Sequence, residues 1–382
     1  MSSRFSLTRI GLGRATFTLS ALCAVAALST AQAQGEEESR LERIWSHAEL
    51  FSGDSDSMID AVTLSGRLQF DQANVDSDED FSTTDLRRFR FGLKVDFLDH
   101  FRFHGEAEYD PNGGDLNYLR LTDAFLSWSR SDSLALKLGK QSVGFTVDGE
   151  TSSKELLTID RNNLTNNIWF TQEYIPGISA SGETSRIVYT LGYFSSGAAN
   201  RGFGDSNGEE FVLATIGHDF AAKLGAREAL LRLNYVDNKP DIHNTFTRPF
   251  ERITSLNFTF ERDRWGVRSD VSAADGYFGQ SDIDGFVVMP FFNLKPKVQL
   301  VTRYTFVESD DVHGIRLPRY TREVQPGRGD EYREIYVGVN YYWFGHKLKF
   351  QNGLEYADMT DRSGSGADYT GWTWTSGFRV SW

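Results

Sequence analysis

Cysteine is almost absent from this sequence of 382 residues, because Cys23 is the only one. It lies inside an apolar run near the start of the chain, in a segment that we expect to be removed. The mature protein then has no disulfide bond, although exported domains commonly rely on them. Its fold must therefore be stabilised in another way.

The first 33 residues have the composition of a secretory signal peptide. Arg4, Arg9 and Arg14 give a basic start, and a stretch of mostly small and apolar residues follows over Ala15–Leu28. The sequence AQA at 31–33 then offers a small-x-small cleavage site after either alanine. We predict that residues 1–33 are a signal peptide and that the mature chain is exported.

Long apolar runs are missing after residue 33. Phe286–Phe292 is among the longest, and it is far shorter than the roughly 20 residues that a helix needs to cross a bilayer. Proline is also scarce, at 8 residues, whereas glycine (35 residues) and aromatic residues (14%) are abundant. We expect a chain of this composition to be all-β with many tight turns.

Positive charge is in deficit, because the net charge of the whole chain is −13. The predicted signal peptide carries three arginines and no acid, so its removal takes the net charge to −16. Nucleic acids bind basic surfaces that replace the counterions along their phosphate backbone. We therefore predict no nucleic-acid partner.

Sequence motifs of enzymes and metal sites are absent: there is no H-E-x-x-H, no G-x-S-x-G and no P-loop. His100 and His104 lie four residues apart in one extended segment, a spacing that is more often structural than metal-binding. The stretch TSSK at 151–154 begins with threonine and lacks the partner motifs of a serine hydrolase. We predict no enzyme activity, no cofactor and no metal site. A hydrolase embedded in a barrel wall is the alternative.

Apolar and polar residues alternate with a period of two along most of the chain. In RFRFGLKVDF (88–97), for example, phenylalanine, leucine and valine occupy every second position, with charged residues or glycine between them. Such alternation predicts strands with one apolar and one polar face. We count sixteen segments of this kind: 62–71, 88–97, 101–110, 118–128, 134–141, 177–183, 186–194, 211–218, 229–236, 256–261, 264–272, 283–291, 297–306, 335–342, 347–356 and 371–382.

The predicted connections alternate between long and short. The gaps 71–86 and 142–176 are long, 98–100 and 129–133 are short, and 219–228 is an exception because it is longer than a turn should be. Long loops at one end of the strands and tight turns at the other are typical of outer-membrane barrels. An even number of strands places both chain ends beside the short turns, on the periplasmic side.

A soluble sandwich would show similar alternation, but it would need an apolar core on each face and turns of similar length at both ends. Here the polar faces carry charged residues in mid-strand, and the apolar faces end in aromatic residues, as at the two interfaces of a membrane. A closed barrel also pairs every backbone group in lipid. We therefore predict an all-β fold, a transmembrane antiparallel β-barrel of about 16 strands.

The last strand, GWTWTSGFRVSW at 371–382, follows the same pattern. Trp372, Trp374, Phe378 and Trp382 share one face, which we expect to contact lipid where this strand closes the barrel. A terminal aromatic residue also suits recognition by barrel-assembly machinery, so we predict that partner for Trp382. Outer-membrane lipid and lipopolysaccharide are the predicted surroundings. The acidic stretch DSDED (76–80) is either a solvated loop or a cation site that bridges lipopolysaccharide.

Several stretches together resemble the phosphate-selective porin O and P family of Gram-negative outer membranes: LSGRLQFD (64–71), LRRFRFGLKVDF (86–97), DAFLSW (123–128), LKLGKQSVGF (136–145), TSSKELLTIDR (151–161) and VGVNYYWFGHKLKFQNGLEY (337–356). The resemblance implies a sixteen-stranded porin, usually a homotrimer, whose long third loop folds into the lumen. It also implies small anions such as phosphate or polyphosphate as permeants.

The chain departs from this family in two places. Residues 34–60 offer only a short acidic stretch, which we predict to be a short periplasmic N-terminal segment before a barrel over 61–382. The third loop, 142–176, carries a net charge of −3 and is not basic. The family name is therefore not in itself evidence for phosphate selectivity.

Basic side chains on the polar faces are the candidate site, because guanidinium and ammonium groups bind oxyanions. We predict as pore-lining and anion-binding residues Arg67, Arg88, Arg90, Lys94, Arg102 and Arg303 on the wall and, from the resemblance, Lys154 and Arg161 in the third loop. The alternative is that these groups only pair with lumen carboxylates or anchor the loop. The predicted function is passive diffusion of small hydrophilic solutes with a preference for anions. A porin that prefers cations or small organic solutes, and a mainly structural barrel, are the alternatives.

Overall fold

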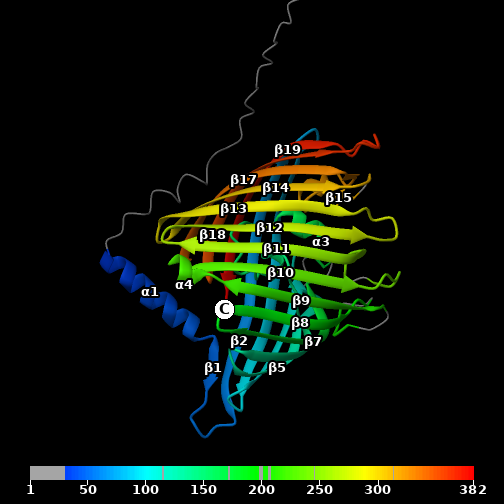
Figure 1. The fold of residues 1–382 in the computed structure, drawn as a ribbon. Helices are drawn as coiled ribbons and strands as arrows, with labels where there is room; N and C mark the ends of the chain where they lie inside the picture. Colours follow the sequence, from blue (N-terminus) through cyan, green and yellow to red (C-terminus); the bar gives the residue numbers. More distant parts are fainter. Residues whose placement is uncertain are drawn as a thin grey trace, which may run out of the picture. The chain divides into compact units, whose positions relative to one another are not determined.

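The computed structural model describes residues 31–382 except 114–115, 171–172, 198–200, 205–207, 245 and 313. Residues 1–30, which include Cys23 and most of the predicted signal peptide, lie outside the described residues. The chain divides into two units, Met1–Ser46 and His47–Trp382. The described part of the first is helix α1 (Ala31–Ser46), and the second holds all the described strands (Figure 1). No described helix is long and apolar enough to cross a membrane.

Sixteen strands of the second unit form a closed antiparallel barrel (Figure 1). Strands β19 and β2 close the ring, with pairs from Trp372↔Asp76 to Ser381↔Arg67. This confirms the predicted fold class and the sixteen predicted strands. The strands are β2 (Ile59–Asp76), β3 (Phe81–Phe97), β4 (Phe101–Asp110), β5 (Asn117–Ser131), β6 (Leu134–Ser142), β7 (Tyr174–Thr184), β8 (Ile187–Ser195), β9 (Glu210–Asp219), β10 (Glu228–Asn238), β11 (Phe250–Arg262), β12 (Trp265–Gly276), β13 (Ile283–Lys295), β14 (Val298–Ser309), β17 (Glu331–Phe344), β18 (Leu348–Thr360) and β19 (Tyr369–Ser381).

The apolar faces of these strands point outward. Phe91, Leu138, Val271 and Ile335 lie in mid-strand and are each exposed by 47% to 62%. Their polar neighbours in the sequence point into the barrel, where Arg90 is fully buried. Because exposed apolar surface is unfavourable in water, this arrangement suits a barrel whose outer wall contacts lipid.

The loop and turn lengths follow the predicted alternation, with two corrections. The gap 71–86 is mostly strand, because β2 continues to Asp76 and β3 starts at Phe81. Its inward residues Ala73 and Val75 are buried, so the pairing extends beyond the clear alternation. The awkward connection 219–228 holds a single helical turn, α4 (Ala221–Leu224), which ends at Gly225 with φ 59°.

A short strand, β1 (Glu49–Ser52), pairs with the first part of β2. The backbone N–H of Leu64 donates to the oxygen of Ala48, while the N–H of Gly66, two residues on, donates to the oxygen of Trp382. Strand β1 therefore pairs with the same edge of β2 as β19, beyond the point where β19 ends. The predicted periplasmic segment 34–60 comprises most of α1, all of β1 and the start of β2. Its compartment stays a prediction.

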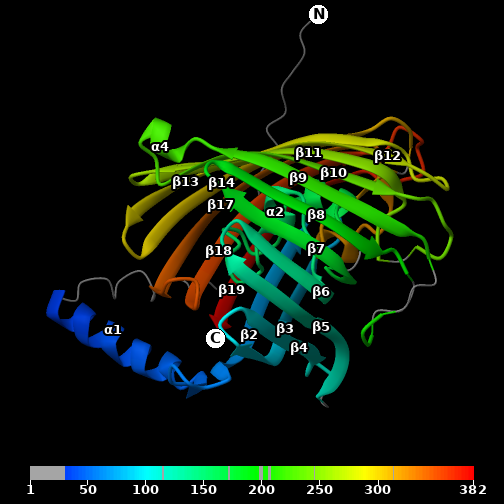
Figure 2. The same cartoon turned by 60° about the horizontal axis from the view of Figure 1, so that its bottom comes forward.

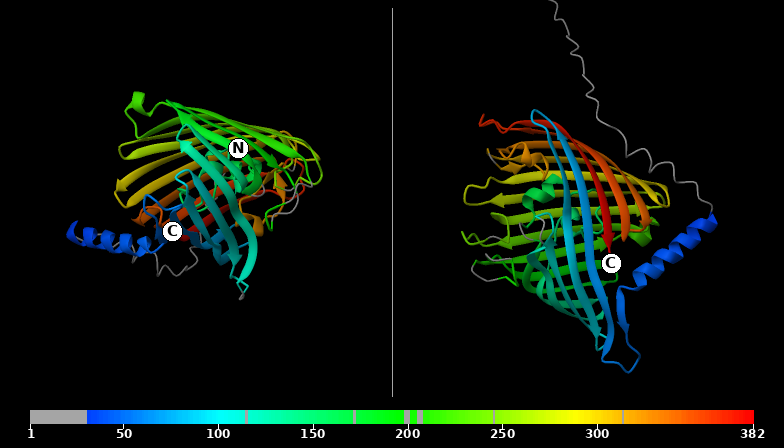
Figure 3. Two further views of the ribbon diagram at one scale, coloured as in Figure 1. Left: turned by 90° about the horizontal axis from the view of Figure 1, so that it is seen from below. Right: turned by 180° about the vertical axis from the view of Figure 1, so that it is seen from behind.

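Two long loops fold into the barrel (Figures 2 and 3). The third loop was predicted to fold into the lumen, and it carries helices α2 (Val147–Glu150) and α3 (Asn163–Ile168), which were not predicted. The loop after β14 was not predicted to fold inward, but it does. It contains β15 (Ile315–Arg316), the 3-10 helix η1 (Thr321–Glu323) and β16 (Arg328–Gly329).

An apolar core holds the two loops together. Leu164 and Ile168 of α3 and Ile315 of β15 are fully buried in one cluster with inward-facing strand residues. Polar contacts fix their register, since Asn167 Oδ1 accepts from the backbone N–H of Arg316 at 2.8 Å. The wall therefore carries inward apolar residues near its long-loop end, where the loops pack.

Candidate pore constriction

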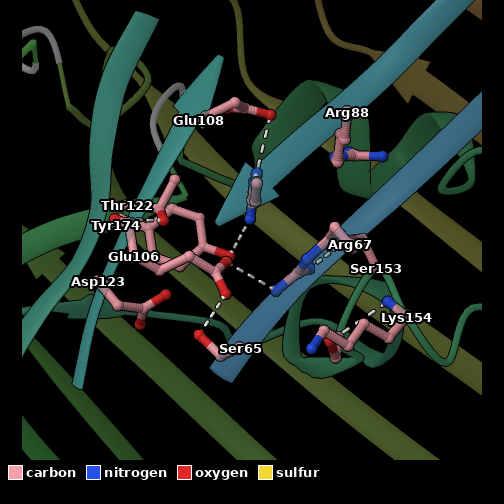
Figure 4. A network of polar contacts seen from close by, with 12 residues as sticks. Ser65, Arg67, Arg88, Glu106, Glu108, Thr122, Asp123, Ser153, Lys154 and Tyr174 are labelled. Atoms are coloured by element: carbon pink, nitrogen blue, oxygen red, sulfur yellow. Dashed lines mark hydrogen bonds and ion pairs between the residues drawn. The ribbon is translucent and has the colours of Figure 1, made fainter. Parts of the chain in front are cut away.

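A polar network covers the inner face of β2 to β5 (Figure 4). Its pairs follow from strand register, because Arg67 on β2 lies directly opposite Arg90 on β3, and Arg90 lies opposite Glu108 on β4. Arg67 Nη2 pairs with Glu106 Oε1 at 3.3 Å, and Arg67 Nη1 donates to Ser153 Oγ of the third loop at 2.6 Å. The arginines of β2 and β3 thus lie beside the glutamates of β4.

Arg90 is the most enclosed of the predicted site residues. Its guanidinium pairs with Glu108 at 3.2 Å and with Glu173 of the third loop at 3.5 Å, and it donates to the Tyr174 hydroxyl. Burial raises the pKa of Glu173, but Arg161, Arg90 and Arg88 outweigh it and hold that pKa well below its usual range. The positive charge of Arg90 is therefore matched by fixed negative charge.

Arg88 is different, because it has no ion-pair partner among the described residues. It is buried, and its Nη1 donates to Gln69 Oε1 at 2.9 Å. The pairing of β3 with β4 begins only at Phe89, so β4 presents no residue opposite Arg88. In Figure 4 no contact joins Arg88 to either glutamate of β4. Lys94 is half-buried and likewise has no ion pair within the described part of the chain.

A β-bulge adds an arginine that alternation did not predict. Gln69 pairs with Arg88 and Phe70 pairs with Leu86, so Arg87 is the extra residue on β3. Its Nε lies 3.9 Å from Asp160 Oδ1 in the third loop, on the lumen side. The only signal in the sequence was the doublet Arg87-Arg88, which regular alternation assigns to opposite faces.

The two predicted loop residues contact backbone and carboxylate groups. Lys154 Nζ donates to the backbone oxygen of Trp382 at 3.0 Å. Arg161 Nε donates to the backbone oxygen of Asp148 at 2.8 Å, and its Nη2 pairs with Glu173 at 3.1 Å. Both side chains tie the third loop to itself or to the wall.

The two remaining predicted residues lie away from this network. Arg102 is near the short-turn end of β4, where it pairs with Asp96 and its side chain is 51% exposed. Arg303 is buried on β14, where it pairs with Glu334 at 2.6 Å and Glu355 at 3.3 Å. Its Nη1 also donates to the backbone oxygen of Asp160 at 3.2 Å, so it joins the third loop to the opposite part of the wall.

A small cavity of about 30 Å³ adjoins Arg303. Side chains of both inward-folded loops and of the wall form it. Its lining comprises Ile159, Asp160, Arg161, Arg303, Pro318, Arg319, Tyr320, Thr321, Tyr336, Glu355, Thr373 and Thr375. Cations, carboxylates, hydroxyls and aromatic rings therefore all reach this one space.

A second basic group, the loop arginine cluster, comprises Arg248, Arg316, Arg322 and Arg328. Arg316 and Arg328 lie opposite each other in the β15–β16 pair, and Arg248 Nη2 donates to the backbone oxygen of Asn166 in α3 at 2.7 Å. Burial and the three neighbouring arginines lower the pKa of Arg248 to about 9. Burial, Arg328 and Arg322 lower the pKa of Arg316 to about 10. Sequence analysis missed this cluster because loop residues have no alternation that marks which of them face the lumen.

A model of the phosphate-selective porin O and P family matches residues 62–250. The family that the sequence resembles is thus the one whose model matches these residues. The match confirms the predicted family and covers β3 to β10 with most of β2, including the third loop. The comparison with curated proteins finds no match.

Solved outer-membrane proteins share the fold of this porin. The loop L8 deletion mutant of OmpT from Vibrio cholerae is 15% identical with a TM-score of 0.57, over 84% of this chain and 99% of that one. The outer membrane channel DcaP of Acinetobacter baumannii is 12% identical with a TM-score of 0.56, over 87% and 100%. The anion-selective porin from Comamonas acidovorans is 12% identical with a TM-score of 0.58, over 84% and 99%. Identities this low show the barrel fold alone.

The porin is therefore an outer-membrane β-barrel of a channel family. Its described residues contain no group of three or more histidine, cysteine or acidic side chains that could hold a metal ion. The arrangement suits binding and transfer of charged solutes, since cationic groups line a space that two loops narrow.

Proposed function

We propose that this porin lets small hydrophilic solutes diffuse passively and that it prefers anions, phosphate among them, over cations. The observation that carries the preference is the loop arginine cluster. Within the described part of the chain, every charged group that shifts the pKa of Arg248 or Arg316 is another arginine. Positive potential from clustered arginines raises the local concentration of anions.

The inner wall supports the same preference. Several of its carboxylates are already matched, as Glu106 is by Arg67 and Glu108 is by Arg90. Arg88 adds a positive charge for which the described part of the chain offers no ion-pair partner. An anion that moves from the loop arginine cluster toward the wall then meets cations and few free carboxylates.

Recordings from the full mature protein in planar bilayers test this proposal. Under a KCl gradient the reversal potential should report that chloride is favoured over potassium. Arg316→Gln should lower that preference, because it removes one charge from the cluster. Arg186→Gln, which removes an exposed arginine in a short turn, is the matched control and should leave the reversal potential unchanged. Potassium selectivity would favour the cation-preferring alternative, and absence of any conductance would favour a structural barrel.

The proposed partners are those expected of an outer-membrane barrel. We propose a homotrimer, because an OmpT of Vibrio cholerae in trimer form shares the fold with a TM-score of 0.52. Outer-membrane lipid and lipopolysaccharide are the proposed contacts of the apolar outer wall, and barrel-assembly machinery is the proposed partner of Trp382. We also propose that the chain is a channel and not an enzyme, as its family and structural neighbours are channels.

A further inference from the structure

A short stretch of the third loop, residues 153–158, follows the inner wall across the closing seam of the barrel. The seam is the pairing of β19 with β2, and the strands that follow β19 around the ring are β18, β17 and β14. We call residues 153–158 the inner strap. Ser153, Leu156, Leu157 and Thr158 of this strap are each exposed by at most 4%, so most of it is packed against other parts of the protein.

The first two residues of the inner strap bind the two sides of the seam. Arg67 Nη1 on β2 donates to Ser153 Oγ at 2.6 Å (Figure 4), and Gln69 Nε2 on β2 donates to the backbone oxygen of Ser153 at 2.8 Å. The next residue, Lys154, donates from its Nζ to the backbone oxygen of Trp382, directly after the end of β19, at 3.0 Å. The strap therefore joins β2 to the end of the closing strand from inside the barrel.

The contacts continue on the two strands beyond β19. Lys349 Nζ and Gln351 Nε2 on β18 donate to the backbone oxygen of Leu156 at 2.7 Å and 3.1 Å. Asn340 Nδ2 on β17 donates to the backbone oxygen of Leu157 at 2.8 Å. The main chain of the strap is thus held by side chains of the wall.

The far end of the inner strap is attached to β14. Arg303 Nη1 on this strand donates to Thr158 Oγ1 at 3.0 Å. The side chain of Leu157 packs in an apolar cluster with Met289 on β13 and Val301 on β14. The order of the strap residues in the sequence therefore matches the order of the five strands around the ring.

The wall side chains that hold the strap also depend on it. Lys349 and Asn340 are fully buried. No carboxylate among the described residues pairs with Lys349, and its ammonium group has the backbone oxygen of Leu156 and His346 Nδ1 as hydrogen-bond partners. A buried donor that loses its acceptor is destabilising, so release of the strap from the wall is disfavoured.

The end of the seam lies at Gly66 and Trp382. The backbone N–H of each donates to the backbone oxygen of the other at 3.2 Å. Two residues before Gly66, the N–H of Leu64 donates to Ala48 instead, so β19 does not extend further along β2. A Cβ atom on Gly66 would meet the indole of Trp382, which shows that this ring lies against the glycine.

We propose that the inner strap keeps this end of the seam closed, a role of the third loop that is separate from narrowing the lumen. The seam opens at its end only when the hydrogen bonds between Gly66 and Trp382 break. Because the strap is bound to β2 on one side and to Trp382, β18, β17 and β14 on the other, opening must also break the strap contacts of one side. This role does not depend on which ions the channel prefers.

Hydrogen exchange of the full protein in detergent micelles tests the strap. Asn340→Leu combined with Gln351→Leu keeps the size of both side chains and removes two amide donors to the strap, on strands that do not form the seam. We expect the Gly66 and Trp382 amides to exchange about tenfold faster in this variant, because the end of the seam opens more often. The amides of β10 and β11, on the far side of the ring, should keep their rates.

Tyr342→Phe is the matched control, because it removes a hydroxyl of β17 that donates to Gln299 at 2.8 Å and not to the strap. Ser153→Ala is the second variant. It removes the strap hydroxyl that accepts from Arg67, and we expect a smaller acceleration at the same two amides.

Three results would overturn the proposal. The first is unchanged exchange of the Gly66 and Trp382 amides in both strap variants. The second is equal acceleration at the seam and in β10 and β11, which would indicate a general loss of stability. The third is the same acceleration at the seam in Tyr342→Phe, which would show that the effect does not pass through the strap.

Discussion

Lys154 of the third loop donates a hydrogen bond from its Nζ to the backbone oxygen of Trp382, the last residue of the chain, at 3.0 Å. The same oxygen accepts the backbone N–H of Gly66 on β2. The residue that ends the closing strand is thereby joined both to the first barrel strand and to the loop that narrows the lumen. One backbone oxygen therefore takes part both in the closure of the barrel and in the attachment of the third loop to the wall.

Lys154→Met should loosen the third loop without unfolding the barrel. Loss of one hydrogen bond from a charged donor costs the docked loop about 2 kcal/mol, whereas the strand ladder is untouched. We expect more current noise and more frequent brief closures in single-channel recordings. Lys154→Arg keeps a charged donor at this position and is the control. A noise spectrum in Lys154→Met identical to that of the unmodified channel would contradict a tethering role.

Arg88 and Arg90 should respond differently to the same substitution. Arg88→Gln removes a charge that has no ion-pair partner among the described residues, so we expect a lower chloride preference and only a small fall of the unfolding temperature in detergent. Arg90→Gln leaves Glu108 and Glu173 buried without this partner, so we expect a loss of about 3 kcal/mol or more in stability. Reversal potentials and thermal unfolding measure the two effects. Equal unfolding temperatures for the two variants would show that the ion pairs of Arg90 are not stabilising.

Tyr320 should hold the loop after β14 in the lumen. Its hydroxyl donates to Asp71 Oδ2 on β2 at 2.8 Å, while its ring is buried in the core of the two loops. Tyr320→Phe removes the hydrogen bond and keeps the packing, so we expect a stability loss of about 1 kcal/mol and a larger single-channel conductance. Arg379 still pairs with Asp71 in this variant, which limits the damage to the loop. A conductance no larger than that of the unmodified channel would mean that this contact does not set the width of the passage.

Much of the wall could be predicted because it obeys local rules. A residue at a given position of a regular strand faces the same side as its neighbours two positions away, whatever the rest of the chain does. Arg67, Arg90 and Arg303 were assigned to the inner face on that basis, and all three side chains are buried inside the barrel. The role of these residues in anion binding stays a prediction.

The partners of these residues could not be predicted. Arg90 meets Glu173, which is 83 residues away in the sequence, and Arg303 meets Thr158, 145 residues away. Arg87 faces the lumen only because a bulge interrupts the regular pairing of β2 and β3. Such contacts depend on register and on the path of the loops, and neither leaves a periodic trace in the sequence.

The sequence by itself determined the number of strands, their order and the face that each presents to lipid, because the backbone of a membrane-spanning strand must pair in a closed ring and its side chains must alternate. Only the tertiary structure decided what fills that ring. The loop after β14 folds inward beside the third loop because Ile315 and Leu317 bury apolar surface against it. That long-range packing set which charges are paired and which, as at Arg88, have no ionic partner among the residues that the structure describes.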